Sequence, residues 1–314
     1  MEQRSTASTK VAFALVCVTL AVQAYRAATL PVGTGEAYLY DRFVRPSTRQ
    51  VFASELPDGN VLYCVLEKRS VGLFHVSPFA VRLPSLVFGV LFFFAVWRLA
   101  RVSLGEGWKS PVAMAVFAAI SLIWGWFARA DGTGTALALF ACAAWLAVVR
   151  QHLNLIGICL GLSITSDTKL WIPALAFGLT VLVLRRRWWE WIDRVAVPAA
   201  VAVVILLAIP ASHFHAPAER PRELTRAQAM HLRSALDALR ADAGTRPIRI
   251  AAAVVAEPIV NFYRAEHRAN NWERASLEDS TGNFDYYVVR AGGAVRAGQS
   301  VYRNGDFAVL RAPF

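Results

Sequence analysis

Residues 153–184 read LNLIGICLGLSITSDTKLWIPALAFGLTVLVL, an apolar stretch with Asp167 and Lys169 near its middle. One unbroken helix over this stretch would run about 48 Å at 1.5 Å per residue, whereas the hydrocarbon of a bilayer is about 30 Å thick. It would also bury both charges inside the membrane, at a high cost. A break at residues 163–169 gives two helices and leaves the charges at the membrane surface. The stretch therefore predicts a helical hairpin.

The rest of the chain is apolar in the same way. Apolar residues make up 56% of the 314 residues, which is high for a soluble domain, and they come in runs. Several runs are shorter than the roughly 20 residues that cross a bilayer, but flanking Trp and snorkelling Arg can extend them. The sequence predicts an α-helical polytopic membrane protein with about seven transmembrane helices, at 11–25, 83–100, 111–127, 135–149, 153–165, 170–184 and 195–211.

Basic residues gather on one side of these predicted spans. The opposite short loops hold only Arg129 and Lys169. An excess of Lys and Arg marks the cytoplasmic side, so the pattern predicts a cytoplasmic N-terminus and a C-terminal region outside the cytoplasm. We expect a multi-pass membrane protein. The basic side carries Arg4, Lys10, Arg98, Arg101, Lys109, Arg150, Arg185, Arg186, Arg187 and Arg194.

A cleaved signal peptide is an alternative for the first span. Residues 1–24 have a basic start and an apolar middle, and Val22-Gln23-Ala24 loosely resembles a cleavage site. Six further predicted spans favour a retained helix.

The net charge of +11 does not indicate a nucleic-acid-binding protein. Residues 213–314 carry 14 Arg against 11 Asp and Glu, so most of the excess belongs to residues 1–212. There it orients helices and meets anionic lipid headgroups. No basic stripe with interleaved aromatic residues suggests a polynucleotide groove.

Metal-binding patterns are weak. Cys17, Cys142 and Cys159 lie in predicted spans, Cys64 lies in the outer loop, and no CxxC pair exists. These thiols are best interpreted as small apolar fillers. The histidines of His213-Phe214-His215 have no third ligand near in sequence.

The outer loop, residues 27–82, opens with GTGEAYLYDRFV at 33–44. We expect its two glycines to loosen the backbone and to place Glu36 just outside the hydrocarbon. An acid held there can accept a proton, bind a cation or pair with an arginine. The alternative is that Glu36 merely caps or solvates a loop. Farther on, apolar residues at near-helical spacing predict short helices lying in the membrane interface, and Pro84 suits the first turn of the second span.

Residues 213–314 predict a small α/β domain. Residues 219–243 have the pattern of an amphipathic helix, with one face made by Leu224, Ala227, Leu232, Ala235, Leu236 and Leu239. A buried strand is expected at 247–255, a helix at 257–268, and strands at 284–290, 299–303 and 306–310, with Asn304-Gly305 as a two-residue turn. Residues 261–264 and 270–272 are candidates for glycan contact, but a core role is favoured for Phe262 and Trp272.

Five short motifs occur in order along the chain: GEAY with YDRFV at 35–44, LPDGNVLY at 56–63, SPFAVRLPS at 77–85, FAR at 127–129, and TK at 168–169. Their order and spacing resemble the GT-C class of integral-membrane glycosyltransferases. The nearest types are the dolichyl/polyprenyl-phosphate-mannose-protein mannosyltransferases and the aminoarabinose transferases. The resemblance covers about residues 10–212, nearly all of a predicted transmembrane module at 1–212 that the 213–314 domain follows.

The resemblance implies a catalytic acid in the first outer loop, usually an Asp-Glu pair. Here Gly35 takes the Asp position and Glu36 remains. Asn60 stands where related sequences often carry His, and Asp131 where they often carry Tyr. Expected donor-phosphate ligands are Arg82, Arg129 and Lys169, for which the alternative is headgroup snorkelling. Expected acceptor-binding or site-lining residues are Tyr38, Tyr40, Asp41, Asn60 and Asp131.

The implied reaction moves a sugar from a polyprenyl-phosphate donor to a lipid, glycan or protein acceptor at the outer face of a bacterial inner membrane, with inversion. No cofactor is required by the sequence, and a divalent cation is possible. One alternative is a catalytically impaired relative that binds lipid or assists assembly. A transporter is a weaker alternative because the charges lie at span ends. The sequence does not identify the sugar or the acceptor.

Overall fold

The computed structural model describes residues 2–46, 60–105, 108–120, 125–149, 153–185, 195–203, 223–277, 283–291 and 298–313. They form two compact units, and each is described by itself. The helical unit comprises the described residues of Met1–Thr29, Ser47–Ser70 and Phe79–Ala218. The sheet unit comprises those of Leu30–Pro46, Val71–Pro78 and Glu219–Phe314.

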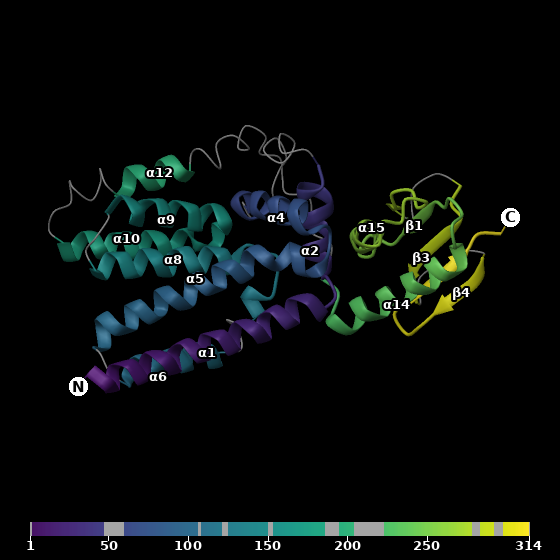
Figure 1. Cartoon of the computed structure of the whole chain (residues 1–314). Helices are drawn as coiled ribbons and strands as arrows, with labels where there is room; N and C mark the ends of the chain where they lie inside the picture. Colours follow the sequence, from purple (N-terminus) through teal and green to yellow (C-terminus); the bar gives the residue numbers. More distant parts are fainter. Residues whose placement is uncertain are drawn as a thin grey trace. The chain divides into compact units, whose positions relative to one another are not determined.

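Among the described residues, a helix lies within each of the apolar runs predicted as spans (Figure 1). In the helical unit α1 packs on α6, and α9 packs on both α8 and α12. The outer-loop helix α4, Val61–Phe74, begins in this unit and was expected as a short interfacial helix. The helices are α1 (Glu2–Thr29), α5 (Pro78–Leu104), α6 (Lys109–Ala119), α8 (Thr133–Val149), α9 (Leu153–Ser166), α10 (Trp171–Arg185) and α12 (Val197–Val203).

Span length is established for fewer helices than the sequence predicts. Within the described ranges, α5 is long and apolar enough to cross a membrane, and a second candidate joins Phe13–Thr29 to Thr34–Val44 across a break. Three other helices are apolar but shorter, over Lys109–Ala118, Thr133–Val149 and Leu153–Ser166. The fold is mostly helical with one or two span-length helices, and seven spans stay a prediction.

The expected break in residues 153–184 is present. Helix α9 ends at Ser166, a short 3-10 turn (η3) covers Thr168–Leu170, and α10 starts at Trp171. Ala174 of α10 packs into the same apolar cluster as Ile156 of α9, so α10 folds back along α9 (Figure 1). The single long helix is excluded and the helical hairpin is confirmed.

An aromatic cluster fixes the loop before α8 against α5. The ring of Phe127 lies 5.3 Å from that of Phe92 and 6.4 Å from that of Phe93, with Met114 buried in the same cluster. On the other side of α5, Val87 and Phe94 are exposed, as suits a helix in lipid. The Phe127 anchor holds the start of the loop that carries Arg129.

The sheet unit contains a mixed five-stranded sheet in the order β2-β1-β3-β5-β4, with α14 (Arg226–Ala243) and α15 (Glu257–Glu266). Strand β1 runs parallel to β2 and β3, whereas β3–β5 and β5–β4 are antiparallel. The predicted α/β domain is therefore confirmed. The strands are β1 (Ile250–Ala252), β2 (Ser276–Leu277), β3 (Tyr286–Arg290), β4 (Gln299–Arg303) and β5 (Phe307–Arg311).

Several local predictions for this domain need correction. Helix α14 begins at Arg226, because Thr225 caps it by accepting a hydrogen bond from the Gln228 amide, and Ala227 in its first turn is exposed rather than on the buried face. Strand β2 was not predicted. The turn between β4 and β5 is centred one residue later than expected, since the Asn304 amide pairs with the Phe307 carbonyl.

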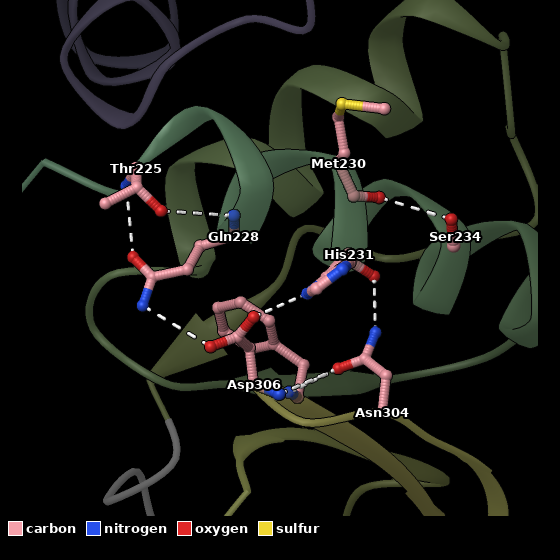
Figure 2. Close-up of polar contacts among 8 residues, drawn as sticks. Thr225, Gln228, Met230, His231, Ser234, Asn304 and Asp306 are labelled. Carbon is pink, nitrogen blue, oxygen red and sulfur yellow. Dashed lines mark hydrogen bonds and ion pairs between the residues drawn. The ribbon is translucent and has the colours of Figure 1, made fainter.

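The N-terminal end of α14 is tied to that turn (Figure 2). Gln228 Nε2 donates to Asp306 Oδ1 at 3.4 Å, and His231 Nδ1 contacts Asp306 Oδ2. Asn304 Nδ2 donates to the His231 carbonyl at 3.0 Å. These contacts join the helix to the β4–β5 hairpin at one corner of the sheet unit.

Candidate active site

Glu36 lies in the first turn of α2 (Thr34–Leu39), in the sheet unit. Gly33 is the N-cap residue, and its amide donates to Glu36 Oε2 at 2.9 Å. The expectation of a loosened backbone is wrong, because Gly35 is helical and the carboxylate caps the helix that contains it. Glu36 therefore caps the N-terminus of its own helix through Oε2. The side chain is 8% exposed.

A second carboxylate lies against Gly35. A Cβ atom at this position would be 3.2 Å from Glu223 Oε1. The segment is held there by the Leu224 amide, which donates to Thr34 Oγ1 at 3.4 Å. Glu223 lies far away in sequence, and no motif pointed to it. Position 35, where the motif usually has Asp, thus has the carboxylate of Glu223 beside it.

Asp41 does not present a free carboxylate as an acceptor-binding residue would. It is 2% exposed and lies in a π-helical turn (η1), Tyr40–Val44. Arg274 Nη2 binds its Oδ2 at 2.6 Å, and Asn261 Nδ2 contacts the same oxygen at 3.4 Å. Arg45 lies 3.6 Å from its Oδ1. Asp41 therefore joins η1 to the C-terminal domain.

The neighbouring tyrosines lie in different surroundings. Tyr40 is buried and packs edge-on against Phe262, with ring centroids 5.3 Å apart. This confirms the packing role expected for Phe262. Tyr38 is partly exposed and packs edge-on against Phe43 at 6.0 Å. Of the two tyrosines, Tyr38 keeps more surface for a ligand.

In the helical unit, three segments meet at Gly132. Its φ of +82° lies in the left-handed region that favours glycine. A Cβ atom here would lie 2.4 Å from the Ser166 carbonyl oxygen and 3.2 Å from Asn60 Oδ1. Close approach and backbone angle both require glycine. This "Gly132 junction" brings together the start of α4, the loop before α8 and the end of α9.

Hydrogen bonds lock the same junction. Thr133 Oγ1 donates to Asp167 Oδ2 at 2.9 Å, and the Thr133 amide donates to Asp131 Oδ1 at 3.1 Å. The Lys169 amide donates to Asp167 Oδ1 at 3.0 Å. Two predicted site residues, Asp131 and Lys169, therefore lie on segments that these bonds hold together, and a third, Asn60, lies beside Gly132. The Lys169 side chain is exposed.

The two predicted arginine ligands differ in exposure. Arg82 is 3% exposed and its Nη1 donates to the Ala27 carbonyl at 3.0 Å, at the end of α1. Arg129 has an exposed side chain, and its backbone oxygen accepts a hydrogen bond from Ser85 Oγ at 2.8 Å. Arg82 and Ser85 of the RLPS motif thus bind the end of α1 and the segment that carries Arg129.

Buried acceptors near the Gly132 junction lack partners. Asn60 is 2% exposed and Thr135 is fully buried, yet Asn60 Oδ1 and Thr135 Oγ1 have no hydrogen-bond partner among the described residues. Buried polar atoms are seldom left in this state. Asn60 was a predicted site residue, whereas Thr135 was not.

Across the part of the chain that the structure describes, no three His, Cys, Asp or Glu side chains gather as a metal site would require. His213 and His215 lie outside the described residues.

Residues 65–214, just under half of the chain, match the family model described as dolichyl-phosphate-mannose-protein mannosyltransferase. No curated protein and no solved structure matches the chain. The match confirms the resemblance found in the motifs and gives the class: a membrane-associated glycosyltransferase of the GT-C type. The dolichyl-phosphate-mannose-protein mannosyltransferases, which that model describes, are one of the GT-C glycosyltransferase families.

The matched region divides the predicted site residues. Arg82, Arg129, Asp131 and Lys169 lie inside it, and Asn60 lies just before it. Glu36 and its neighbours up to Arg42 also precede it and belong to the sheet unit. The family match therefore bears on the cationic part of the site, and the role of Glu36 rests on the motif at 35–44.

Proposed function

We propose that this protein transfers a sugar from a polyprenyl-phosphate donor to an acceptor at the outer face of a bacterial inner membrane, inverting the anomeric centre. Glu36 is the general base that deprotonates or orients the acceptor. Arg129 and Lys169 hold the donor phosphate with Arg82. The C-terminal domain lies on the same, periplasmic side.

The Gly132 junction is the observation that carries this proposal. Its segments lie in or next to the family-matched region, and they carry Arg129 and Lys169 with exposed side chains. Departure of a sugar builds negative charge on the donor phosphate, and fixed cations stabilise that charge more in the transition state than in the ground state. Loops locked at Gly132 and Asp167 hold such cations without reorganisation.

The unpartnered Asn60 Oδ1 supports a polar ligand at the same junction. A buried carbonyl oxygen is stabilised when it accepts a hydrogen bond, and a sugar hydroxyl is a suitable donor. Asn60 is therefore assigned to sugar binding. Tyr38 and Asp131 line the acceptor side, whereas Tyr40 and Asp41 have structural contacts.

An impaired relative that binds donor lipid without transferring sugar is the second candidate. Gly35 favours it, because one acid of the expected pair is missing. A transporter is the weaker third candidate.

A transfer assay with a panel of radiolabelled lipid-linked sugars tests the proposal. Glu36→Gln should keep donor binding and lower transfer by about 10²–10⁴-fold, the usual scale for a lost general base. Lys169→Ala and Arg129→Ala should weaken donor binding, because each removes a charge-assisted contact. Lys109→Ala, on the predicted cytoplasmic side, is the matched control. Equal turnover in wild type and Glu36→Gln would rule out Glu36 as the base, and binding without turnover in the wild type would favour the impaired relative.

Orientation needs its own test. A reporter fused after Phe314 that is active only in the periplasm should be active. A cytoplasmic readout would remove one predicted span and move the C-terminal domain to the other side.

A further inference from the structure

The helix that carries Glu36 is too short to hold its own orientation. Helix α2 has six residues and continues into a π-helical turn of five residues, closed by a bond from the Arg45 amide to the Tyr40 carbonyl at 2.8 Å. Isolated helices need about 12–15 residues to be even marginally stable in water, and π turns are rare. Contacts from elsewhere in the sheet unit must therefore fix this segment.

Asp41 supplies the strongest of these contacts. Its side chain is 1% exposed, and Arg274 Nη2 lies 2.6 Å from its Oδ2. A buried carboxylate is tolerated only where it is paired and hydrogen-bonded. Asn261 Nδ2 reaches the same oxygen at 3.4 Å. Both partners come from the C-terminal part of the chain, more than 200 residues after Asp41.

Two further hydrogen bonds fix the orientation of the Asn261 side-chain amide. It is buried, its Oδ1 accepts from the Ala275 amide at 2.9 Å, and its Nδ2 also donates to Glu257 Oε1 at 2.8 Å. The amide cannot be turned over without losing both of these bonds. Ala275 follows Arg274 directly, so one short segment places both partners of Asp41.

The remaining charges around Asp41 complete the network. Arg45 lies 3.6 Å from Asp41 Oδ1, and Arg42 lies 3.9 Å from Glu257 Oε2. Beside these charged groups, the ring of Tyr40 packs on that of Phe262. The network thus has two acids, three arginines and one amide, and it joins η1 to α15 and to the segment before β2.

We propose that Arg274 and Asn261 are positioning residues that hold the Glu36 helix in its working orientation through Asp41. The inference rests on the proposed role of Glu36. Asp41 follows Glu36 by five residues, about 7.5 Å along a helix, so a displacement at Asp41 moves the Glu36 carboxylate. The C-terminal domain is on this view a structural part of the transfer machinery.

The test compares Arg274→Gln and Asn261→Ala with wild type in the detergent-solubilised full chain. The control is Arg249→Gln, which breaks an exposed ion pair of the same domain, Arg249 to Glu273 at 3.2 Å. Hydrogen exchange reports on amides of residues 34–45 and, for comparison, on β3 and β5. Transfer assays give kcat and the KM for donor.

Both test variants should speed exchange at residues 34–45 by about tenfold or more while β3 and β5 stay protected, because only the local contact is lost. The kcat should fall by about tenfold or more while the donor KM changes less than about twofold, since a misplaced base slows the chemical step. Arg274→Lys keeps the charge and should restore part of the kcat. The control should change neither readout.

Unchanged exchange at residues 34–45 in Arg274→Gln and Asn261→Ala overturns the inference, as does an unchanged kcat per folded molecule. If Arg274→Gln does not fold, Asn261→Ala and Arg274→Lys provide the same comparison. A wild type without transfer activity refutes the proposed function instead. The exchange measurement then still decides whether these two residues hold the helix.

Discussion

Thr133 Oγ1 and Asp167 Oδ2 lie 2.9 Å apart, although 34 residues separate them in sequence. The contact joins the start of α8 to the turn between α9 and α10. Asp167 is 5% exposed, and its other oxygen accepts from the Lys169 amide at 3.0 Å. One buried carboxylate therefore fixes the loop before α8 and sets the backbone beneath Lys169.

Asp167→Ala should destabilise the protein by about 1.5–3 kcal/mol, the range for hydrogen bonds to a charged group. Donor binding should weaken with it, because the Lys169 turn loses its anchor. Asp167→Asn keeps one acceptor oxygen, so it should lose less stability and less donor binding than Asp167→Ala. Melting temperature and donor binding, measured on the same preparations, check this. Equal losses in both variants would show that the negative charge, not the hydrogen bonds, holds the turn.

Gly132→Ala should be among the most damaging single-methyl additions in the helical unit. The left-handed backbone costs about 1–2 kcal/mol for a residue with a Cβ, and overpacking against the Ser166 carbonyl at 2.4 Å adds about 1–3 kcal/mol. Substitutions at two other glycines distinguish the backbone strain from the overpacking. Gly105→Ala has the positive φ and open space, so it should show the strain alone.

Gly72→Ala in α4 has open space and no positive φ, so it should be neutral or gain about 0.5–1 kcal/mol. Thermal unfolding of the three variants gives the order of their stabilities. A Gly132→Ala protein as stable as Gly105→Ala would mean that the segments at the junction separate easily.

The sequence was sufficient where periodicity and burial decide the structure. Helices formed in the apolar runs, and the break between α9 and α10 fell at the charged residues Asp167 and Lys169, as predicted. The Asn304-Gly305 turn signal located the two strands beside it, predicted at 299–303 and 306–310 and found as β4 and β5 to within one residue. Two-residue β2 was missed, because its pairing with β1 is long-range and leaves little pattern in so short a segment.

The candidate site was harder to predict for the same reason. Order along the chain identified Asn60, Asp131 and Lys169, and the Gly132 junction then joined their segments. Glu223, Asp167 and Arg274 could not be found this way, since each acts through a partner 34 or more residues away that no local pattern encodes. Asp41 was assigned to acceptor binding from its position beside Glu36, but the partners that bury it lie in the C-terminal domain.

Glu257→Gln should flatten the pH dependence of stability. Burial raises the pKa of Glu257, an effect that Arg42 opposes and the charge of Asp41 increases, with Arg274 and the Asn261 hydrogen bond opposing as well. Because the folded pKa lies above 4.5, the ionised carboxylate costs stability above that folded pKa, and the loss is recovered as pH falls toward 4.5.

The glutamine variant stays neutral and still accepts from Asn261, so its advantage over wild type should be larger at pH 8 than at pH 5. Melting temperatures of the full chain at the two pH values provide the measurement. If Glu257→Gln is more stable than wild type by the same amount at both pH values, or less stable at both, burial of an ionised Glu257 does not set the pH dependence.

Gly35→Asp restores the acid pair implied by the family motif, and the structure predicts that the change alone brings little gain. A Cβ at residue 35 lies 3.2 Å from Glu223 Oε1, so the new carboxylate would face an existing one. Glu223 is exposed and can turn aside, but two like charges about 4 Å apart repel by about 1–4 kcal/mol in water or near a protein surface. The pKa of one acid would rise and its charge would be partly lost.

Gly35→Asp with Glu223→Gln removes that conflict, because an amide can donate a hydrogen bond to the new carboxylate. The double variant should therefore transfer sugar faster than wild type by about tenfold or more, and faster than Gly35→Asp alone by about fivefold or more. Glu223→Gln alone should match wild type within about twofold. If Gly35→Asp alone equals the double variant, the Glu223 contact does not limit the site. If neither variant gains while Glu36→Gln abolishes transfer, this chain works with a single acid in its outer loop.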